Sequence, residues 1–256
     1  MEIGSPIAVV VTGDGINCDY ETARAFSLAG ADARRVHINR ILNDPSLLAE
    51  ASVLAFPGGF SFGDDLGSGK VLSLKIKHFL RDPIRRFIER GGLVIGICNG
   101  FQALVKMGLL PNREGHRWEQ EVSLTHNIPL GFVNTWVKLR VNPSSPCVWT
   151  SGLSEIELPI RHGEGRLVVG EMIEGGVDHL KELGMVPLEY ESLEINGSEG
   201  QAAALCDPSG RIFGLMPHPE AFVISENHPR WTREEVGPLG LEIFRNAMKE
   251  IQKERE

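Results

Sequence analysis

The hydrophobic positions in the first half of the chain fall into short apolar runs that alternate with amphipathic stretches. Continuous apolar runs rich in β-branched residues are typical of strands buried on both faces of a sheet. Such runs predict strands at Ile7–Val11, Val53–Phe56 and Leu93–Ile97, with Arg34–Ile38 as a further candidate. Helical spacing predicts helices at Cys18–Leu28, Val71–Arg90 and Phe101–Met107, and Pro83 is expected to kink or split the second of these. This alternation indicates a parallel sheet with helices on both faces.

The second half of the chain is different, because polar and apolar residues alternate there and turns rich in Pro, Gly and Ser intervene. Strands are predicted at Phe132–Val141 and Glu155–Ile160. A late hairpin and a closing helix are predicted from Gln201–Leu205, Arg211–Leu215 with the turn Asp207–Gly210, and Leu239–Ile251. No repeat or long linker divides the sequence. We therefore expect an α/β fold, a doubly wound mostly parallel sheet with an antiparallel extension, as a single domain over residues 1–256.

Composition and charge exclude several classes of protein. The chain has 256 residues, of which 42% are hydrophobic and 23% charged, and its formal net charge is −8. A nucleic-acid-binding protein usually presents a basic face, so neither nucleic acid nor an anionic membrane is an expected partner. The chain start lacks the features of a secretory signal, and no apolar run reaches the ~20 residues of a membrane helix. Four widely spaced cysteines indicate reduced thiols, and we expect a cytoplasmic protein.

The segment from Gly96 to Gly100 has the form G-x-C-x-G, a nucleophile elbow in which Cys98 stands where hydrolases carry serine. It follows an apolar strand and precedes a helix, as an elbow requires. The helix N-terminus beneath the thiol favours the thiolate, and the N–H of Asn99 is expected to point to a developing oxyanion. The alternative is a buried core cysteine beside convenient glycines. Cys98 is the candidate nucleophile.

The segment Met216–Glu220 supplies a candidate base at the end of a predicted strand. Residues i and i+2 of an extended segment point the same way, so Glu220 could orient the ring of His218 and stabilise its imidazolium form. Prolines on both sides of His218 keep the segment extended and rigid. A surface turn with a stray histidine is the alternative. Cys98, His218 and Glu220 together form a candidate triad.

Glycines after the third predicted strand complete the candidate site. Gly59 allows close approach of the backbone, and its N–H is the candidate second oxyanion donor, although an ordinary strand-to-loop turn explains the glycine equally well. Gly59–Gly63 also matches G-x-S-x-G, which would make Ser61 the nucleophile, but loop residues follow it instead of a helix. Gly67–Lys70 lacks the first glycine and the final Ser or Thr of a P-loop, so ATP binding on this chain is not supported.

The remaining polar motifs carry less information. The eight histidines are scattered and form no Cys/His cluster along the chain, so no metal site is expected. The Gly-rich segment His162–Arg166 follows the strand predicted at Glu155–Ile160. Its mixture of His, Glu and Arg suits either a structural turn or contact with a polar substrate or partner.

These motifs resemble those of a known enzyme family. Gly96–Gln102 is similar to the nucleophile motif of class I glutamine amidotransferases, and His218–Glu220 is similar to their His-x-Glu pair. Within that superfamily, Pro57–Asp64, His162–Arg166 and Met216–Glu220 together resemble the glutaminase subunits of phosphoribosylformylglycinamidine synthase, an enzyme of purine biosynthesis, and Gly15–Asp19 resembles their N-terminal turn. The resemblance runs from residue 7 to about residue 250.

The resemblance implies a flavodoxin-like class I glutaminase fold and the hydrolysis of glutamine through a Cys-His-Glu triad and a glutamyl thioester. By matching position, Cys98 is the nucleophile, His218 the base and Glu220 its orienter, and Gly59 and Asn99 supply the oxyanion N–H groups. Four further residues lie in matched motifs as candidate glutamine contacts: Phe60, Gln102, His162 and Glu164.

The resemblance also implies partners. Ammonia would pass to a separate synthetase subunit (PurL), which makes formylglycinamidine ribonucleotide with ATP and Mg²⁺, and a small third subunit (PurS) often bridges the two. No cofactor is expected on this chain. The chain departs from many free-standing members at Asp65–Gly67, and Asn112–Asn127 and Ser225–Val236 are longer than in compact members. The alternatives are another cysteine hydrolase on the same fold and a non-catalytic regulatory subunit.

Overall fold

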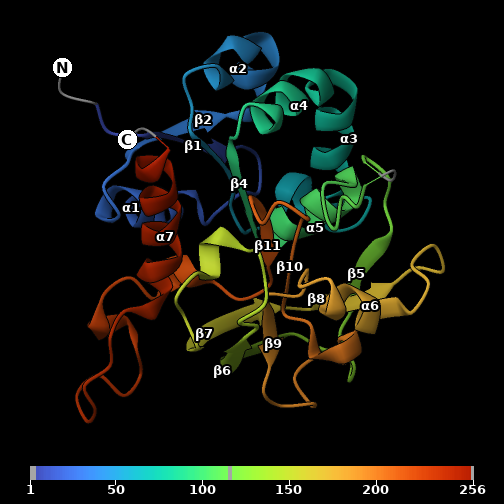
Figure 1. Ribbon diagram of the computed structural model, residues 1–256, viewed down its shortest axis with the longest axis vertical. Coiled ribbons are helices and arrows are strands. Elements are labelled where there is room, and N and C mark those ends of the chain that lie inside the picture. Colours follow the sequence, from blue (N-terminus) through green and yellow to red (C-terminus); the bar gives the residue numbers. More distant parts are fainter. Residues whose placement is uncertain (1–3, 115–116, 255–256) are drawn as a thin grey trace.

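A six-stranded sheet forms the centre of the computed structural model, which describes residues 4–114 and 117–254 (Figure 1). The chain start at residues 1–3, positions 115–116 of the segment Asn112–Asn127, and the last two positions of the predicted domain lie outside the described residues. The strand order is β10-β11-β4-β3-β1-β2, and β10 pairs antiparallel with β11 while the other neighbours pair in parallel. The strands are β1 (Ile7–Thr12), β2 (Asp32–His37), β3 (Val53–Phe56), β4 (Leu93–Ile97), β10 (Ala204–Cys206) and β11 (Ile212–Leu215).

Helices cover both faces of this sheet, as the sequence predicts. On one face α1 (Asp19–Leu28) packs against α7 (Leu239–Lys253), and the rings of Phe26 and Phe244 meet edge to face with centroids 4.9 Å apart. On the other face α3 (Lys70–Phe79) packs against α5 (Asn99–Met107), with α4 (Arg81–Glu89) beside them (Figure 1). The predicted doubly wound, mostly parallel sheet is therefore confirmed. None of the helices in the described part of the chain is long and apolar enough to span a bilayer.

Two predicted elements in the first half differ from the structure. The stretch Val71–Arg90 forms two helices that break at Leu80, because Pro83 has no N–H to donate and its ring would clash with the carbonyl of Phe79 in a continuous helix. The strand predicted at Arg34–Ile38 ends at His37. There the His37 side chain accepts a hydrogen bond from the Asn39 N–H and caps α2 (Ile38–Asn43), a helix that the hydrophobic pattern did not predict.

The second half builds two small antiparallel sheets beside the central one. β6 (Val133–Val141) lies between β7 (Glu155–His162) and β9 (Leu188–Tyr190), and β5 (Val122–His126) pairs with β8 (Glu164–Val169). The antiparallel extension and the β10–β11 hairpin are confirmed, although Gln201 lies in a 3₁₀ turn before β10. The sequence patterns missed β5, β8, β9 and α6 (Gly176–Glu182).

The register of the central sheet places the predicted site residues at one edge. Phe56 at the end of β3 pairs with Gly96 in β4, and Ile97 at the end of β4 pairs with Leu215 at the end of β11. The residues that follow these strands therefore leave the same carboxyl edge, where open α/β sheets bind their ligands. The extension reaches this edge too, because the His218 N–H donates to the carbonyl of Pro159 in β7 at 2.8 Å.

Candidate active site

Cys98 lies at the sharp turn between β4 and α5. Its backbone angles, φ 51° and ψ −107°, are unusual for a residue with a side chain and cost about 1–3 kcal/mol. The turn brings α5 so close to β3 that a Cβ at Gly100 would overlap the carbonyl oxygen of Phe56. The glycine of the G-x-C-x-G pattern is therefore required by packing, and the turn presents the buried thiol 3.8 Å from the carbonyl oxygen of Arg161 in β7.

His218 and Glu220 form a buried hydrogen-bonded pair. The Nδ1 atom of His218 lies 2.6 Å from Oε1 of Glu220, and both residues are 3% exposed. The sequence predicted an extended segment, but Pro219–Ala221 forms a 3₁₀ turn, and the Glu220 carboxylate bonds Nδ1 at the edge of the ring. With Nδ1 committed to the carboxylate, Nε2 is the nitrogen left for chemistry, and no described residue bonds it.

The electrostatic environment of His218 favours its protonated form. Burial of the ring lowers the pKa of His218, but the charges of Glu220 and Cys98 and the nearby thiols of Cys18 and Cys98 outweigh the burial, so the pKa is raised well above its usual value. The ring can therefore hold a proton next to the sulfur of Cys98, which is what a donor to a leaving group requires.

The two predicted oxyanion donors occupy suitable backbone positions. Gly59 has φ +143°, and an added Cβ would lie 2.5 Å from the Gly15 carbonyl oxygen, so the position requires glycine. Its N–H bonds no acceptor in the described chain. The Asn99 N–H is in the first turn of α5, where backbone donors have no partner within the helix. The Asn99 side chain joins the start of α5 to the loop after β3. Its Oδ1 accepts a hydrogen bond from the Ser61 N–H at 3.0 Å, and its Nδ2 donates to Asp64 at 3.0 Å.

A cavity of about 440 Å³, here called the site cavity, opens at this edge of the sheet. It brings together most of the predicted site residues, while Asn99 and Glu220 support them from behind. The cavity is lined by Asn17, Cys18, Gly59, Phe60, Asp64, Ser68, Cys98, Gln102, Phe132, Arg161, His162, Gly163, Glu164 and His218. Phe60 and Phe132 are more than half exposed and lie at its mouth.

Gln102 and Glu164 are held by other protein groups. The Gln102 amide accepts a hydrogen bond from Asn99 Nδ2 at 3.0 Å and donates to the Glu164 carbonyl oxygen at 2.5 Å. The Glu164 carboxylate accepts a hydrogen bond from the Ser68 hydroxyl at 2.6 Å. Gln102 therefore joins α5 to the start of β8, Glu164 joins β8 to the loop after β3, and both shape the wall of the site cavity.

His162 enters the cavity as a neutral imidazole. Burial and the neighbouring His218 lower the pKa of His162 to about 4. Asn127 fixes its tautomer: Nδ2 of Asn127 donates to the carbonyls of Gly131 and His162, so its Oδ1 must accept from His162 Nδ1, 3.2 Å away. His162 Nε2 then carries a lone pair, and no described residue bonds it. The sequence reading missed Asn127, which sits in no recognisable motif.

Cys18 is the second residue that the sequence reading left without a role. It follows β1, and its Sγ lies within 4.8 Å of both a ring nitrogen of His218 and a carboxylate oxygen of Glu220. The spacing along the sequence shows no Cys/His cluster, but the fold brings Cys18, His218 and Glu220 together. The only signal was the Gly15–Asp19 turn in the family resemblance.

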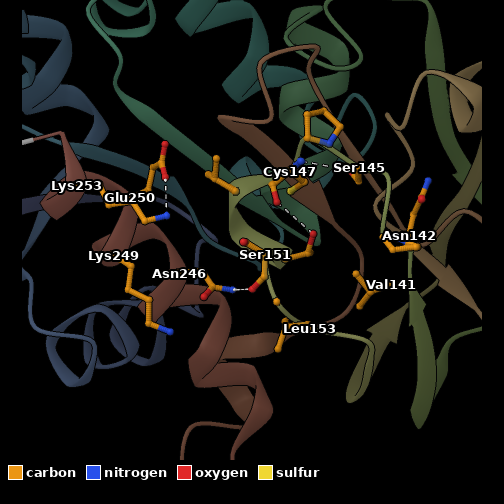
Figure 2. A pocket seen from close by; sticks show the side chains of 15 residues that line it. Val141, Asn142, Ser145, Cys147, Ser151, Leu153, Asn246, Lys249, Glu250 and Lys253 are labelled. Carbon is orange, nitrogen blue, oxygen red and sulfur yellow. Dashed lines mark hydrogen bonds and ion pairs between the residues drawn. The ribbon is translucent and has the colours of Figure 1, made fainter.

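A second cavity, of about 240 Å³ and here called the α7 cavity, shares none of these residues (Figure 2). It lies between α7 and the segment after β6, and its polar side chains bond one another and the backbone. Asn246 donates to the Ser151 carbonyl (Figure 2). It also donates to the Trp149 carbonyl, and Thr150 Oγ1 donates to the Cys147 carbonyl. It contains no candidate nucleophile–base pair among its described lining residues.

Comparisons with known proteins identify the family of the chain. The profile of the CobB/CobQ-like glutamine amidotransferase domain matches residues 5–249. The chain is 46% identical over 250 residues to the phosphoribosylformylglycinamidine synthase subunit PurQ of Dehalococcoides mccartyi, covering 94% of this chain and 96% of the relative. It is 36% identical over 271 residues to PurQ of Methanococcus maripaludis, covering 97% and 98%.

A solved structure gives the same result. A chain in the structure of PurLQS from Thermotoga maritima superposes with a TM-score of 0.74 at 31% identity, covering 96% of this chain and 99% of that one. Both the full-length identity to PurQ proteins and the shared fold point to one branch of the superfamily. The chain belongs to the PurQ family, the class I glutamine amidotransferases that serve as glutaminase subunits of phosphoribosylformylglycinamidine synthase.

Proposed function

We propose that Cys98, His218 and Glu220 are the catalytic triad with which this glutaminase subunit hydrolyses glutamine. The observation that carries the assignment is the convergence of three buried groups at one sheet edge: a thiol at a strained elbow, and an imidazole whose Nδ1 is held by a carboxylate at 2.6 Å. Nε2 of His218 has no hydrogen-bond partner among the described residues, so it is available to transfer protons, as the histidine of such a triad does.

In the proposed reaction, the Cys98 thiolate attacks the side-chain carbonyl carbon of glutamine. The N–H groups of Gly59 and Asn99 bind the oxyanion that forms. His218 gives its proton to the leaving nitrogen, so ammonia departs and a glutamyl thioester remains on Cys98. His218 then takes a proton from water, the resulting hydroxide attacks the thioester, and glutamate leaves as the thiolate is restored.

We assign substrate binding to Phe60, Gln102, His162 and Glu164. The neutral His162 supports this role, because its lone pair at Nε2 can accept a hydrogen bond from the glutamine ammonium group. Phe60 offers an apolar wall at the cavity mouth for the glutamine methylenes. Gln102 and Glu164 act through the shape of the cavity, since their polar groups are already bonded.

We infer that the ammonia is used by a synthetase subunit of the PurL kind, with a PurS-like subunit bridging the two, in the cytoplasm. The similarity to a chain of a PurLQS assembly supports this inference. In this scheme ATP and Mg²⁺ bind the synthetase, and this chain needs no cofactor of its own.

The decisive experiment compares glutamine-dependent and ammonia-dependent synthesis in the complex, using Cys98→Ala. We expect glutamate release to fall by about 10⁴-fold or more, while synthesis from added ammonia continues. Retained glutamine hydrolysis would contradict the assignment of Cys98. No hydrolysis by the unmodified chain, alone or in the complex, would instead favour a non-catalytic subunit. Labelling of Cys98 by a glutamine-like affinity reagent such as diazo-oxonorleucine separates a glutaminase from another cysteine hydrolase.

A further inference from the structure

The thiol of Cys18 and the ring of His218 face the same small space. The Cys18 N–H bonds the Gly58 carbonyl at 3.2 Å, which fixes the turn after β1 against the strand end of β3. A carbon added at Gly58 would lie 3.3 Å from Cys18 Sγ and 2.9 Å from His218 Cε1. One donor atom each from Cys18, His218 and Glu220 lies within 4.8 Å of the other two.

Two buried atoms in this group lack hydrogen-bond partners among the described residues: Nε2 of His218 and Oε2 of Glu220. The triad chemistry uses Nε2, but it gives no role to the second oxygen of the carboxylate. A buried carboxylate oxygen without a donor is costly. A cation is one group that would satisfy this oxygen.

We propose that Cys18, His218 and Glu220 form a binding site for a thiophilic divalent cation, of which Zn²⁺ is the example. Thiolate, imidazole and carboxylate are all Zn²⁺ ligands, with bonds of about 2.0–2.3 Å. Tetrahedral ligands at those bond lengths are roughly 3.3–3.8 Å apart, so groups already within 4.8 Å need only small side-chain movements. The site cavity leaves room for water at a fourth position.

The site would oppose catalysis, because it uses the same imidazole and carboxylate as the triad. A cation bound at Nδ1 of His218 and by Glu220 replaces the proton that now joins them. The ring then keeps only its Nε2 proton, and giving that proton to the leaving group would leave an imidazolate, so the step is blocked. Reversible inhibition of glutamine hydrolysis by Zn²⁺, relieved by a chelator, follows. This inhibition rests on the proposed triad, whereas binding of the cation does not.

The test is calorimetric titration of Zn²⁺ into the full chain with a non-chelating reductant present. We expect one strong site that Cys98→Ala retains and that Cys18→Ala weakens by about 100-fold or more, at least as much as loss of a supporting contact costs. Cys147→Ala is the matched control and keeps the site. Unchanged binding in Cys18→Ala would overturn the proposal, as would loss of binding in Cys98→Ala, which assigns the cation to the Cys98–His218 pair.

A second measurement guards against a variant that fails to fold. Co²⁺ bound to the Cys98→Ala chain should show the near-ultraviolet absorption of a cobalt–thiolate bond, and that band should disappear on addition of Zn²⁺. A Co²⁺ complex of this chain without a thiolate band contradicts ligation by Cys18. Failure of the proposed catalytic function would leave both binding results unchanged, so the two proposals can fail separately.

Discussion

The site cavity and the α7 cavity are each lined by cysteine, but they differ in whether their buried polar groups have hydrogen-bond partners. In the site cavity, buried atoms of His162 and His218 have no partner among the described residues. In the α7 cavity, the amide of Asn246 and the hydroxyl of Thr150 bond backbone carbonyls at 2.8–3.4 Å. Unsatisfied buried groups cost stability and persist where chemistry needs them. The contrast therefore separates a site built for reaction from a cavity left by packing.

The thiols follow the same division. Cys98 stands at a helix N-terminus beside an imidazole. Cys206 is fully buried behind the α7 cavity, where hydrogen bonding with Cys147 and burial raise the pKa of its thiol. Reactivity of a cysteine depends on access to its thiolate, so its surroundings, rather than the residue type, single out Cys98 as the proposed nucleophile.

Among the variants considered, Glu220→Gln in the active site should have the largest effect on activity. We expect glutamine hydrolysis to fall by about 10³–10⁴-fold, as when the orienting acid of a triad becomes an amide. The pKa of His218 should fall, because Glu220 raises it, so the alkaline limb of the pH–rate profile should move to lower pH. The matched control is Glu250→Gln in the α7 cavity, which should leave the rate unchanged. Equal losses of hydrolysis rate in the two variants would show that the two cavities do not differ in function.

The buried, neutral imidazole of His162 predicts that the folded chain is sensitive to acid. The pKa of His162 is about 4 in the folded chain and about 6.5 in the unfolded chain. Between these values the unfolded chain binds a proton that the folded chain excludes, so the free energy of unfolding decreases as pH falls from about 6.5 towards 4. The full loss is on the order of 3 kcal/mol. Urea denaturation at several pH values measures this decrease, and His162→Asn should flatten it; an unchanged slope in that variant would contradict the prediction.

Rates of alkylation compare the reactivity of the thiols in the two cavities directly. Iodoacetamide should modify Cys98 about 100-fold faster than Cys147 or Cys206, because the latter two are less exposed, 3% and 0% against 7%, and have no imidazole beside them among the described residues. Peptide mass spectrometry over a time course gives the three rates separately. Similar rates would show that the environment of Cys98 does not activate it.

Asn246→Ala tests the role of the α7 cavity in stability and should have the smallest effect of these variants. Loss of its two hydrogen bonds, to the carbonyls of Trp149 and Ser151, should reduce the free energy of unfolding by about 1–2 kcal/mol. Glutamine hydrolysis should remain as in the unchanged chain. A reduced hydrolysis rate in the folded variant would mean that the α7 cavity is coupled to the active site.

Local signals explain what the sequence predicts well. The elbow around Cys98 is encoded within five residues, and the His-x-Glu pair within three, so both could be found without a structure. The strands β3 and β4 are fully buried and apolar, and their predicted bounds are those observed. Pro83 marked the split of the long helix, although only the structure shows the break three residues earlier.

Features that depend on distant contacts could not be predicted in this way. β9 has three residues and is defined by its pairing with β6, which no local pattern reveals. The nearness of Cys18 to His218 arises because β1, β3, β4 and β11 end at one edge of the sheet. The tautomer of His162 depends on Asn127, a residue 35 positions away.

The position of β11 in the sheet has a consequence for biosynthesis. Although β11 is the last strand in the described part of the chain, it lies between β4 and β10, next to the strand that leads into the proposed nucleophile. A nascent chain on the ribosome holds Cys98 long before it holds His218. A chain truncated before β11 therefore carries the proposed nucleophile without its proposed base, and it cannot consume the cell's glutamine by that mechanism.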